Sequence, residues 1–378
     1  MRILLVTGPG GSGRTTVAAA TALAAARRGD RVLLTGEDPT TGLPGVETAR
    51  LDPDARFRAE IAALQERGSA VLDLLGARPL QAEELTAVPG ALQFALLRTL
   101  RRAAESGAYD LLVVDLPPVR EAVELLALPA QLRRYLRRLL PAERQAARSL
   151  RPVLAQLAGV PMPAQWLYET AARWDEELAA VQRAVESGSA AVRLVAEPGP
   201  AGSAAVRSAV TGLALHQLPL DLLVANRVLP RDCADPWLAG LRAQQDKCLT
   251  EWAAYGPGMP RELPHLGRDP QGPEDLALLD PGTGTGATRP DWPVEDRRAE
   301  DGVLVWTVPL PGATKEGLEL VRRGDELLLA AGPFRRIVPL PAALRRCTVS
   351  GAALTDGELR IRFTPDPGLW PAGSRNTA

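Results

Sequence analysis

A glycine-rich turn near the N-terminus constrains the fold of this chain more than any other feature. The apolar run Ile3 to Thr7 leads into Gly8-Pro-Gly-Gly-Ser-Gly-Arg-Thr-Thr16, and an alanine-rich stretch, Val17 to Arg28, follows. This order of strand, loop and helix is that of a P-loop, in which backbone N–H groups and the positive end of a helix converge on a phosphate. The alternative is an ordinary glycine-rich turn of an α/β sheet. Because both flanking elements are predicted, we favour phosphate binding.

The loop supplies most of the predicted binding residues, and one of them departs from the P-loop pattern. Thr15 stands where a hydroxyl meets Mg²⁺ in such loops, and Arg14 stands where the pattern has lysine. Arginine is also cationic, but it is bulkier and forked, so the replacement is not neutral. The predicted phosphate-binding residues are Gly8, Gly10, Gly11, Ser12, Gly13, Arg14, Thr15 and Thr16.

Five short runs, mostly β-branched or leucine-rich, predict buried parallel strands separated by helices. This alternation indicates an α/β fold with a doubly wound, mostly parallel sheet. Ligands of such sheets bind beyond the carboxyl ends of the strands, so the residues that follow each strand are candidates for one site. The runs are residues 3–7, 31–35, 110–115, 191–196 and 220–225.

Polar residues at three strand ends are predicted to complete the site. Asp38, after the second run, is placed to orient an attacking water, although Asp-Pro is also a common turn. Asp115 closes the third run as a carboxylate partner of Mg²⁺ would, or else it caps the next helix. Asn226 follows the fifth run and is assigned to an adenine edge, with a simple turn asparagine as the alternative. The predicted catalytic residues are Asp38 and Arg14, and the predicted metal ligands are Thr15 and Asp115.

Taken together, these motifs resemble the arsenite-pump-driving and tail-anchored-protein-targeting ATPases, the ArsA-like group of deviant P-loop ATPases. The family's P-loop, Gly-Lys-Gly-Gly-Val-Gly-Lys-Thr-Thr, aligns with Gly8 to Thr16, and its first switch, Asp-Pro-Ala, aligns with Asp38 to Thr40. Its second switch aligns with Asp115 to Pro129, and its adenine-loop region with Pro264 to Leu279. The resemblance defines an ATPase domain over residues 1–279 and is more specific than any one motif.

The resemblance implies an ATPase that uses ATP and Mg²⁺, forms a homodimer and binds a hydrophobic client helix or unfolded segment. The family's signature lysine reaches the phosphates across the dimer interface, and here its position is Pro9, which has nothing to donate. The second-switch histidine is Glu121. Loss of a phosphate-clamping cation can cost several powers of ten in rate, so Pro9 and Arg14 predict ATP binding with weak or impaired turnover.

The region after the second switch is predicted to be a helical subdomain, at about residues 119–188. Leucines recur at helical spacing in residues 125–140, and a second apolar stripe covers residues 166–185. Relatives use this region as a groove for the client, so the resemblance implies a hydrophobic binding surface. Core packing is the alternative, and we favour it for most of these residues.

A second domain is predicted beyond a linker. Residues 280–302 are rich in Gly, Pro and Thr and then in charge, which predicts flexibility. Short strands and turns follow in residues 303–364, where Leu310-Pro-Gly312 and Asp356-Gly-Glu-Leu-Arg-Ile-Arg-Phe363 resemble an α-crystallin-like (small heat-shock protein-like) β-sandwich. An unrelated β-sandwich is the alternative. Residues 365–378 are predicted to form a disordered tail.

Composition narrows the partners and the location. Lys and Arg number 44 against 45 Asp and Glu, so we expect no attraction to nucleic acid and at most peripheral membrane contact. A partition-type ATPase acting on DNA is a weaker third hypothesis, because no basic C-terminal surface is evident. The three cysteines lack metal-binding spacing, which disfavours an arsenite site or a zinc-linked dimer. No signal peptide or membrane-length segment is evident, which predicts a soluble, cytoplasmic protein.

Two functional hypotheses remain. The first is an ATPase whose nucleotide cycle opens and closes a client-binding dimer. The second is a catalytically inactive holdase or scaffold that uses the helical groove and the α-crystallin-like domain. The two replaced lysines favour the second hypothesis, whereas the retained strand-end residues favour at least ATP binding.

Overall fold

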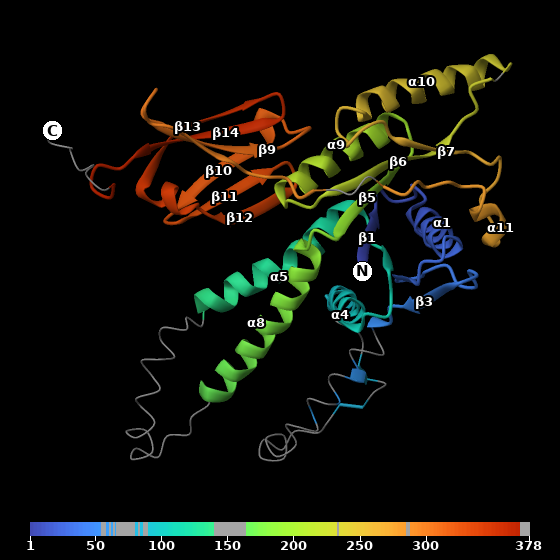
Figure 1. The fold of residues 1–378 in the computed structure, drawn as a ribbon, viewed down its shortest axis with the longest axis horizontal. Coiled ribbons are helices and arrows are strands. Elements are labelled where there is room, and N and C mark those ends of the chain that lie inside the picture. Colours follow the sequence, from blue (N-terminus) through green and yellow to red (C-terminus); the bar gives the residue numbers. More distant parts are fainter. Residues whose placement is uncertain are drawn as a thin grey trace. The chain divides into compact units, whose positions relative to one another are not determined.

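One sheet has seven strands, in the order β3-β2-β4-β1-β5-β6-β7 (Figure 1). The pairs β2–β3, β2–β4, β5–β6 and β6–β7 are all parallel, and the strand order extends outward from β1 in both directions. The predicted doubly wound, mostly parallel α/β sheet is thereby confirmed. Its strands are β1 (Arg2–Thr7), β2 (Val32–Gly36), β3 (Val46–Arg50), β4 (Leu111–Asp115), β5 (Ala190–Ala196), β6 (Leu220–Val228) and β7 (Arg261–Pro264).

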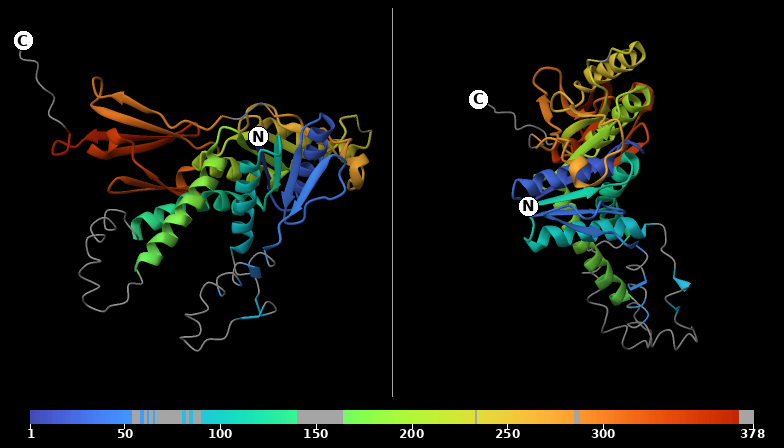
Figure 2. Two further views of the ribbon diagram at one scale, coloured as in Figure 1. Left: turned by 60° about the horizontal axis from the view of Figure 1, so that its bottom comes forward. Right: turned by 90° about the vertical axis from the view of Figure 1, so that its right-hand side faces the viewer.

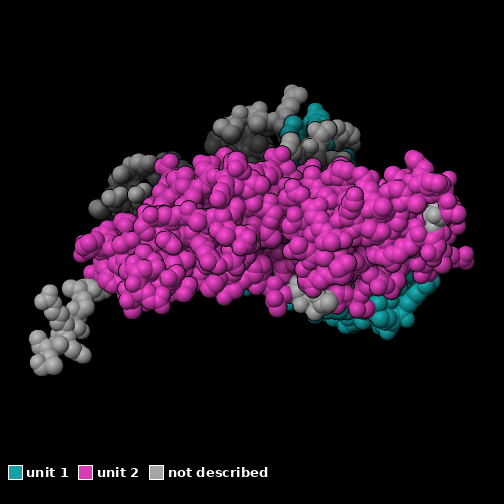
Figure 3. Space-filling view, turned by 90° about the horizontal axis from the view of Figure 1, so that it is seen from above, with its two compact units in different colours: residues 1–3, 22–115, 125–190 teal, residues 4–21, 116–124, 191–378 magenta. Residues whose placement is uncertain are grey.

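The computed structural model divides the chain into two compact units (Figure 3). One unit comprises Met1–Ile3, Ala22–Asp115 and Leu125–Ala190, and the other comprises Leu4–Thr21, Leu116–Glu124 and Ala191–Ala378. The residues described are 1–53, 90–139, 164–232, 234–284 and 288–370, with positions 58–59, 62, 65, 80–81 and 84–85. The predicted tail beyond residue 370 lies outside these residues.

Burial separates the central strands from the edge strands. In β4 the first four side chains are buried, and in β1 every side chain after Arg2 is buried, as expected of strands covered on both faces. The edge strands β3 and β7 carry charged side chains and are buried only in part. The ends of β2 and β4 come close together, since a Cβ on Gly36 would lie 3.0 Å from the Cβ of Asp115.

Helices connect the parallel strands. Helix α1 begins at the P-loop and buries an alanine-rich face that includes Ala18, Ala19 and Ala22. Helices α5 and α8 run side by side (Figures 1 and 2), where Arg133 donates hydrogen bonds to Asp175 and Gln182. The helices are α1 (Arg14–Arg27), α4 (Ala91–Ser106), α5 (Val119–Leu139), α8 (Ala164–Glu186), α9 (Pro200–Leu215), α10 (Pro236–Trp252) and α11 (Gly272–Leu276).

Two antiparallel sheets, β10-β11-β12 and β13-β14-β9-β8, form the C-terminal domain. Its core includes Trp306, Phe334 and Phe363, each at most 3% exposed. Strand β8 lies within residues 280–302, for which the sequence predicts a linker, and pairs with β9. The strands are β8 (Val294–Arg297), β9 (Val303–Pro309), β10 (Leu318–Arg323), β11 (Glu326–Ala331), β12 (Phe334–Pro339), β13 (Cys347–Thr355) and β14 (Glu358–Pro365), with short 3₁₀ turns at Lys315–Gly317 and Ala342–Arg346.

The C-terminal sheets pack on helix α9, which belongs to the same unit. Gly212 of α9 faces the ring of Phe334, because a Cβ at this glycine would lie 2.6 Å from a ring carbon. Thr211 donates a hydrogen bond to the carbonyl of Pro311, and Arg336 donates one to the carbonyl of Leu215 at the end of the helix. The domain is thus seated on α9 by ring packing and by hydrogen bonds to main-chain oxygens.

Candidate functional site

The P-loop is shaped by two glycines that no larger residue can replace. A Cβ on Gly8 would lie 1.9 Å from the carbonyl oxygen of Val195 in β5. A Cβ on Gly13, whose φ is +87°, would lie 2.2 Å from the amide nitrogen of Asn226. By contrast, Gly10 and Gly11 are exposed and have open space where a Cβ would be. The loop therefore fits tightly against its own unit on one side and is open on the other.

A buried hydroxyl in the loop has no partner. Ser12 is 4% exposed, and its Oγ makes no hydrogen bond within the described structure. An unsatisfied buried polar atom in a folded protein calls for an explanation, and an unbound ligand is one of the ordinary ones. The orphaned Ser12 hydroxyl and the open space beside Gly10 and Gly11 fit a loop that accepts a polar group such as a phosphate.

Asn226 braces the loop from the end of β6. Its Nδ2 donates a 2.9 Å hydrogen bond to the carbonyl oxygen of Ser12, and the residue is 6% exposed. The structure therefore brings this predicted residue to the P-loop. The bond to Ser12 engages only the amide nitrogen.

The segment after Asp115 is hydrogen-bonded to the end of β1 and to the P-loop. Arg14 Nη1 donates to the carbonyl of Leu116 at 2.6 Å, and Thr7 Oγ1 donates to the carbonyl of Pro117 at 2.8 Å. The amide of Val119 donates to the carbonyl of Gly8 at 3.1 Å. The arginine that replaces the P-loop lysine thus holds a main-chain oxygen of the second-switch region.

Arg227 is a site residue that sequence reasoning missed. It follows Asn226, adopts φ +57°, and lies where the pairing of β6 with β7 shifts register between Ala225 and Val228. Its Nη1 donates to the carbonyl oxygen of Gly11 in the P-loop at 3.3 Å. A left-handed backbone at a residue other than glycine is uncommon and marks places where the fold imposes a conformation. No local sequence pattern predicts this conformation at Arg227.

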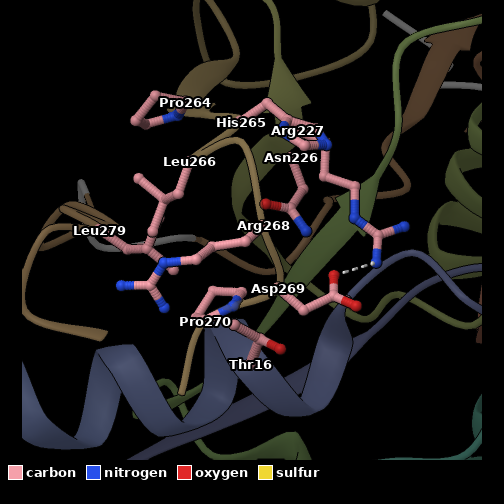
Figure 4. Close-up of a pocket in the computed structure, with 11 residues that line it drawn as sticks. Thr16, Asn226, Arg227, Pro264, His265, Leu266, Arg268, Asp269, Pro270 and Leu279 are labelled. Carbon is pink, nitrogen blue, oxygen red and sulfur yellow. Dashed lines mark hydrogen bonds and ion pairs between the residues drawn. The ribbon is translucent and has the colours of Figure 1, made fainter. Parts of the chain in front are cut away.

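A pocket of about 250 Å³ lies beside the P-loop. Figure 4 shows it between the loop that follows β7, the end of β6 and helix α1, which contributes Thr16. Arg268 forms a bidentate ion pair with Asp275 of α11, and the amide of Gln271 donates to the same carboxylate. These bonds, the Gln271 amide first, hold the pKa of Asp275 below its usual range. The pocket is lined by Gly13, Thr16, Asn226, Arg227, Pro264, His265, Leu266, Arg268, Asp269, Pro270 and Leu279.

Asp38 follows strand β2, and Asp115 is the last residue of the neighbouring strand β4. Both lie in the unit that contains Ala22–Asp115. Asp38 is exposed and comes two residues after the end of β2, and Asp115 is half-buried at the end of β4. The two strands pair in parallel with Leu34 opposite Val113. The two predicted carboxylates are therefore brought to the same end of neighbouring strands.

The residues present fit a magnesium ion only if a ligand supplies further oxygens. Among the described residues there is no cluster of three or more His, Cys, Asp or Glu side chains able to hold a metal. Thr15 is exposed at the start of α1. Mg²⁺ commonly takes one or two protein oxygens together with substrate phosphates and waters. The predicted ligands Thr15 and Asp115 belong to different units, so their joint role stays a prediction.

The helical region carries both buried and exposed apolar side chains. Leu125 of α5 and Leu178 of α8 are buried, whereas Leu139, at the far end of α5, is 78% exposed. Phe94 of α4 and Trp174 of α8 stack edge to face, 6.3 Å apart, and both remain exposed. Residues 140–163 of the predicted helical subdomain lie outside the described residues. No described helix combines the length and apolarity needed to cross a membrane.

Comparisons with known proteins agree with this architecture. The profile of the family described as anion-transporting ATPase matches residues 1–46 and 45–277, and that of an HSP20-like domain found in ArsA matches residues 301–363. The uncharacterized protein SCO2128 of Streptomyces coelicolor is 60% identical over 99% of this chain and 100% of its own length. Protein Rv2184c of Mycobacterium tuberculosis is 29% identical over 98% of this chain and 97% of its own length. A proposed arsenical pump-driving ATPase 1 of Aquifex aeolicus is 24% identical over 96% of this chain and 99% of its own length. The chain therefore belongs to the ArsA family of anion-transporting ATPases and carries the HSP20-like domain found in that family.

Proposed function

We propose that this protein binds Mg·ATP at the Gly8–Thr16 loop, hydrolyses it slowly, and couples its nucleotide state to the binding of a hydrophobic client in the cytoplasm. The observation that carries the proposal is the loop itself. Gly8 and Gly13 seat it tightly against Val195 and Asn226, while its open side presents Gly10, Gly11 and a buried hydroxyl without a partner. This arrangement suits a polyanion bound by backbone N–H groups.

The neighbouring pocket is assigned to the base. It adjoins Gly13 and Thr16, so a nucleotide whose phosphates occupy the loop would place its adenine there. The oxygen of the Asn226 amide is assigned to the exocyclic amino group of adenine, since Nδ2 is already bonded to Ser12. Thr15 and Asp115 are assigned to Mg²⁺, and Asp38 to the attacking water.

We expect slow turnover because the loop has no lysine at either of the two positions where the family has one. Pro9 supplies no charge, and Arg14 is engaged by the carbonyl of Leu116 at 2.6 Å. Stabilising the charge that develops on the phosphates is the main catalytic task in phosphoryl transfer. An arginine whose Nη1 is held by a main-chain oxygen is restrained in how it can follow the charge that develops on the phosphates, so we expect hydrolysis to be slow compared with binding.

The client is assigned to apolar surface of the helical region. The exposed pair Phe94 and Trp174, with Tyr135 and Leu139 of α5, provides aromatic and aliphatic side chains suited to an apolar helix. A homodimer would supply two such surfaces and two nucleotide sites. An arsenical substrate is less supported, because the two described cysteines, Cys248 and Cys347, are both buried.

The test measures nucleotide binding and hydrolysis separately. Mg·ATP and Mg·ADP are titrated by calorimetry, and single-turnover phosphate release is then measured for the wild type and Arg14→Lys. We expect binding of both nucleotides, slow release in the wild type and faster release in the lysine variant, because lysine restores the P-loop pattern. Failure of the wild type to bind either nucleotide would sink the proposal.

The second candidate is a holdase that binds nucleotide without turning it over, or binds none. The anchored Arg14 is the observation that favours it. It predicts that a peptide with an apolar helix binds equally well with and without Mg·ATP. A nucleotide-dependent change in the affinity for such a peptide would instead favour the coupled ATPase.

A further inference from the structure

We infer that Arg227 is the residue that supplies a cation to the phosphate chain of a bound nucleoside di- or triphosphate, in place of the lysine that the P-loop lacks. The inference rests on the proposed nucleotide binding and assigns a role to a residue outside the loop. Three features carry it: an enforced backbone conformation, long and replaceable contacts, and the engagement of the other arginines nearby.

The backbone of Arg227 is held in place by a buried glutamine. Gln245 of α10 is 7% exposed, and its Oε1 accepts from the amide of Leu229 at 2.8 Å. Its Nε2 donates to the carbonyl of Arg227 at 3.2 Å. One side chain thus holds main-chain groups of Arg227 and Leu229, within and just past the register shift in β6, where Arg227 has a φ of +57°. This conformation directs the guanidinium to the P-loop without any residue of the loop having to supply it.

The contacts that Arg227 makes are long and are shared among weak competitors. Nη1 lies 3.3 Å from the carbonyl of Gly11 and 3.4 Å from Glu197, and Nη2 lies 3.4 Å from Asp269. Figure 4 shows the Asp269 contact at the edge of the pocket. The Glu197 and Asp269 side chains are 52% and 86% exposed, and charge-assisted hydrogen bonds normally measure about 2.7–2.9 Å. A phosphate at the loop would be a better acceptor than either carboxylate.

The other arginines at the site are held more firmly. Arg14 is bonded to the carbonyl of Leu116 at 2.6 Å, and Arg268 is paired in bidentate fashion with Asp275. Asp275 is only 11% exposed as a side chain, and it also accepts from a main-chain amide. Of the arginines described at the loop and pocket, Arg227 therefore makes the contacts that a ligand most easily replaces.

The experiment compares ligands with and without phosphates. Affinities for Mg·ADP, a non-hydrolysable Mg·ATP analogue and adenosine are measured by calorimetry for the wild type, Arg227→Gln and Arg227→Lys. We expect Arg227→Gln to weaken both phosphorylated ligands by about tenfold or more, because a hydrogen bond to a charged group is lost, and to change the affinity for adenosine far less. Arg227→Lys is expected to fall between the two, since it keeps the charge and loses the fork.

Two further variants make the result specific. Arg231→Gln removes the same charge from an exposed arginine that pairs with Glu262 outside the pocket lining, so it is the matched control and leaves all affinities unchanged. Asp269→Asn keeps Arg227 and removes a competitor, so it tightens Mg·ADP binding. Thermal melting of each variant verifies that the chain is folded.

The outcomes separate this inference from the proposed function. If the wild type binds Mg·ADP and Arg227→Gln binds it equally well, the role of Arg227 is overturned and nucleotide binding stands. If adenosine binding falls as much as Mg·ADP binding, Arg227 shapes the base pocket and does not hold phosphate, which also overturns the inference. If the folded wild type binds none of the three ligands, both ideas are rejected together.

Discussion

The guanidinium of Arg14 donates a 2.6 Å hydrogen bond to the main-chain oxygen of Leu116, the residue that follows the predicted metal ligand Asp115. The P-loop and the start of the second-switch region are therefore joined through a side chain as well as through the amide of Val119, which donates to Gly8. A ligand that draws the guanidinium toward its phosphates would release Leu116. Arg14 is thus a connection between the loop and the segment next to it.

Removal of that connection should loosen the segment. Arg14→Ala is expected to increase the hydrogen-exchange rate of the Val119 amide, because the backbone from Leu116 onward loses one of its attachments to the loop. Hydrogen–deuterium exchange, detected by mass spectrometry on a peptide that covers residues 116–124, measures this rate. Arg28→Ala, just past the far end of α1, is the control and should leave that peptide unchanged. Equal protection in Arg14→Ala would show that the hydrogen bond does not matter for the segment.

Gly13→Ala should weaken nucleotide binding by disturbing the fit between the loop and Asn226. The new Cβ would lie 2.2 Å from the Asn226 amide nitrogen, so Asn226 and the loop must separate. Gly29→Ala is the matched control, because its φ is +93° and it has open space around it. Each substitution is expected to cost about 1 kcal/mol through its positive φ. Only Gly13→Ala should reduce Mg·ADP affinity, by about tenfold or more; similar affinities for the two variants would contradict this account of the loop.

The sequence patterns predicted the strands whose side chains are buried. They missed the edge strands, which are defined by hydrogen-bonded pairing with a neighbouring strand. The five apolar runs became β1, β2, β4, β5 and β6, because each is covered on both faces and therefore rich in Leu and Val. Strands β3 and β7, Val-Glu-Thr-Ala-Arg and Arg-Glu-Leu-Pro, lie at the edges of the sheet and have no such signal. In the C-terminal domain the match to the α-crystallin pattern is confirmed by the HSP20-like profile over residues 301–363.

The same distinction applies to the site. Asn226 was identified because asparagine at a strand end has a recognisable chemical use, and the structure places it against Ser12. Arg227 escaped notice because its position depends on Gln245, eighteen residues later in the chain, and on a register shift in β6. Long-range hydrogen bonds of this kind leave no local pattern. The assigned roles of Asp38, Thr15 and Asp115 stay predictions.

Helix α9 should tolerate a methyl group far less well than helix α10. Gly212→Ala would place its Cβ 2.6 to 2.8 Å from three ring carbons of the buried Phe334, so it should destabilise the seating of the C-terminal domain by about 1–3 kcal/mol. Gly240→Ala, on an exposed face of α10 with open space, should instead stabilise by about 0.5–1 kcal/mol. Denaturant unfolding of both variants measures the difference. The same sign of change in both would argue against close packing at Gly212.

Arg193 and Asp221 form a buried ion pair, so we expect the stability losses from substituting each of them not to add. Arg193 Nη2 lies 2.8 Å from Asp221 Oδ2, and Arg193 Nη1 donates to Thr21 of α1; the two charged side chains are 1% and 9% exposed. Arg193→Met leaves a buried carboxylate without its cation and should cost about 3–5 kcal/mol. Adding Asp221→Asn removes the charge and should recover a large part of that loss, as read from denaturant midpoints. Costs that simply add would show that the two groups do not act as a pair.

His216 should make the protein lose stability in mild acid. It ends α9 close to Arg336, and burial, followed by the positive charge of Arg336, lowers the pKa of His216 to about 3. An unfolded histidine has a pKa of about 6.5, so between pH 6.5 and 3 the unfolded chain binds the extra proton and the native chain does not. Stability therefore falls as the pH drops through that window, by at most about 1.4 kcal/mol per pH unit from this group, and the group has no effect above it. Denaturant unfolding at pH 7 and pH 5 should show a smaller loss for His216→Gln than for the wild type. The exposed His265, changed to Gln, is the control and should keep the wild-type dependence; equal pH dependence in His216→Gln and the wild type would mean that His216 is accessible to protons in the native state.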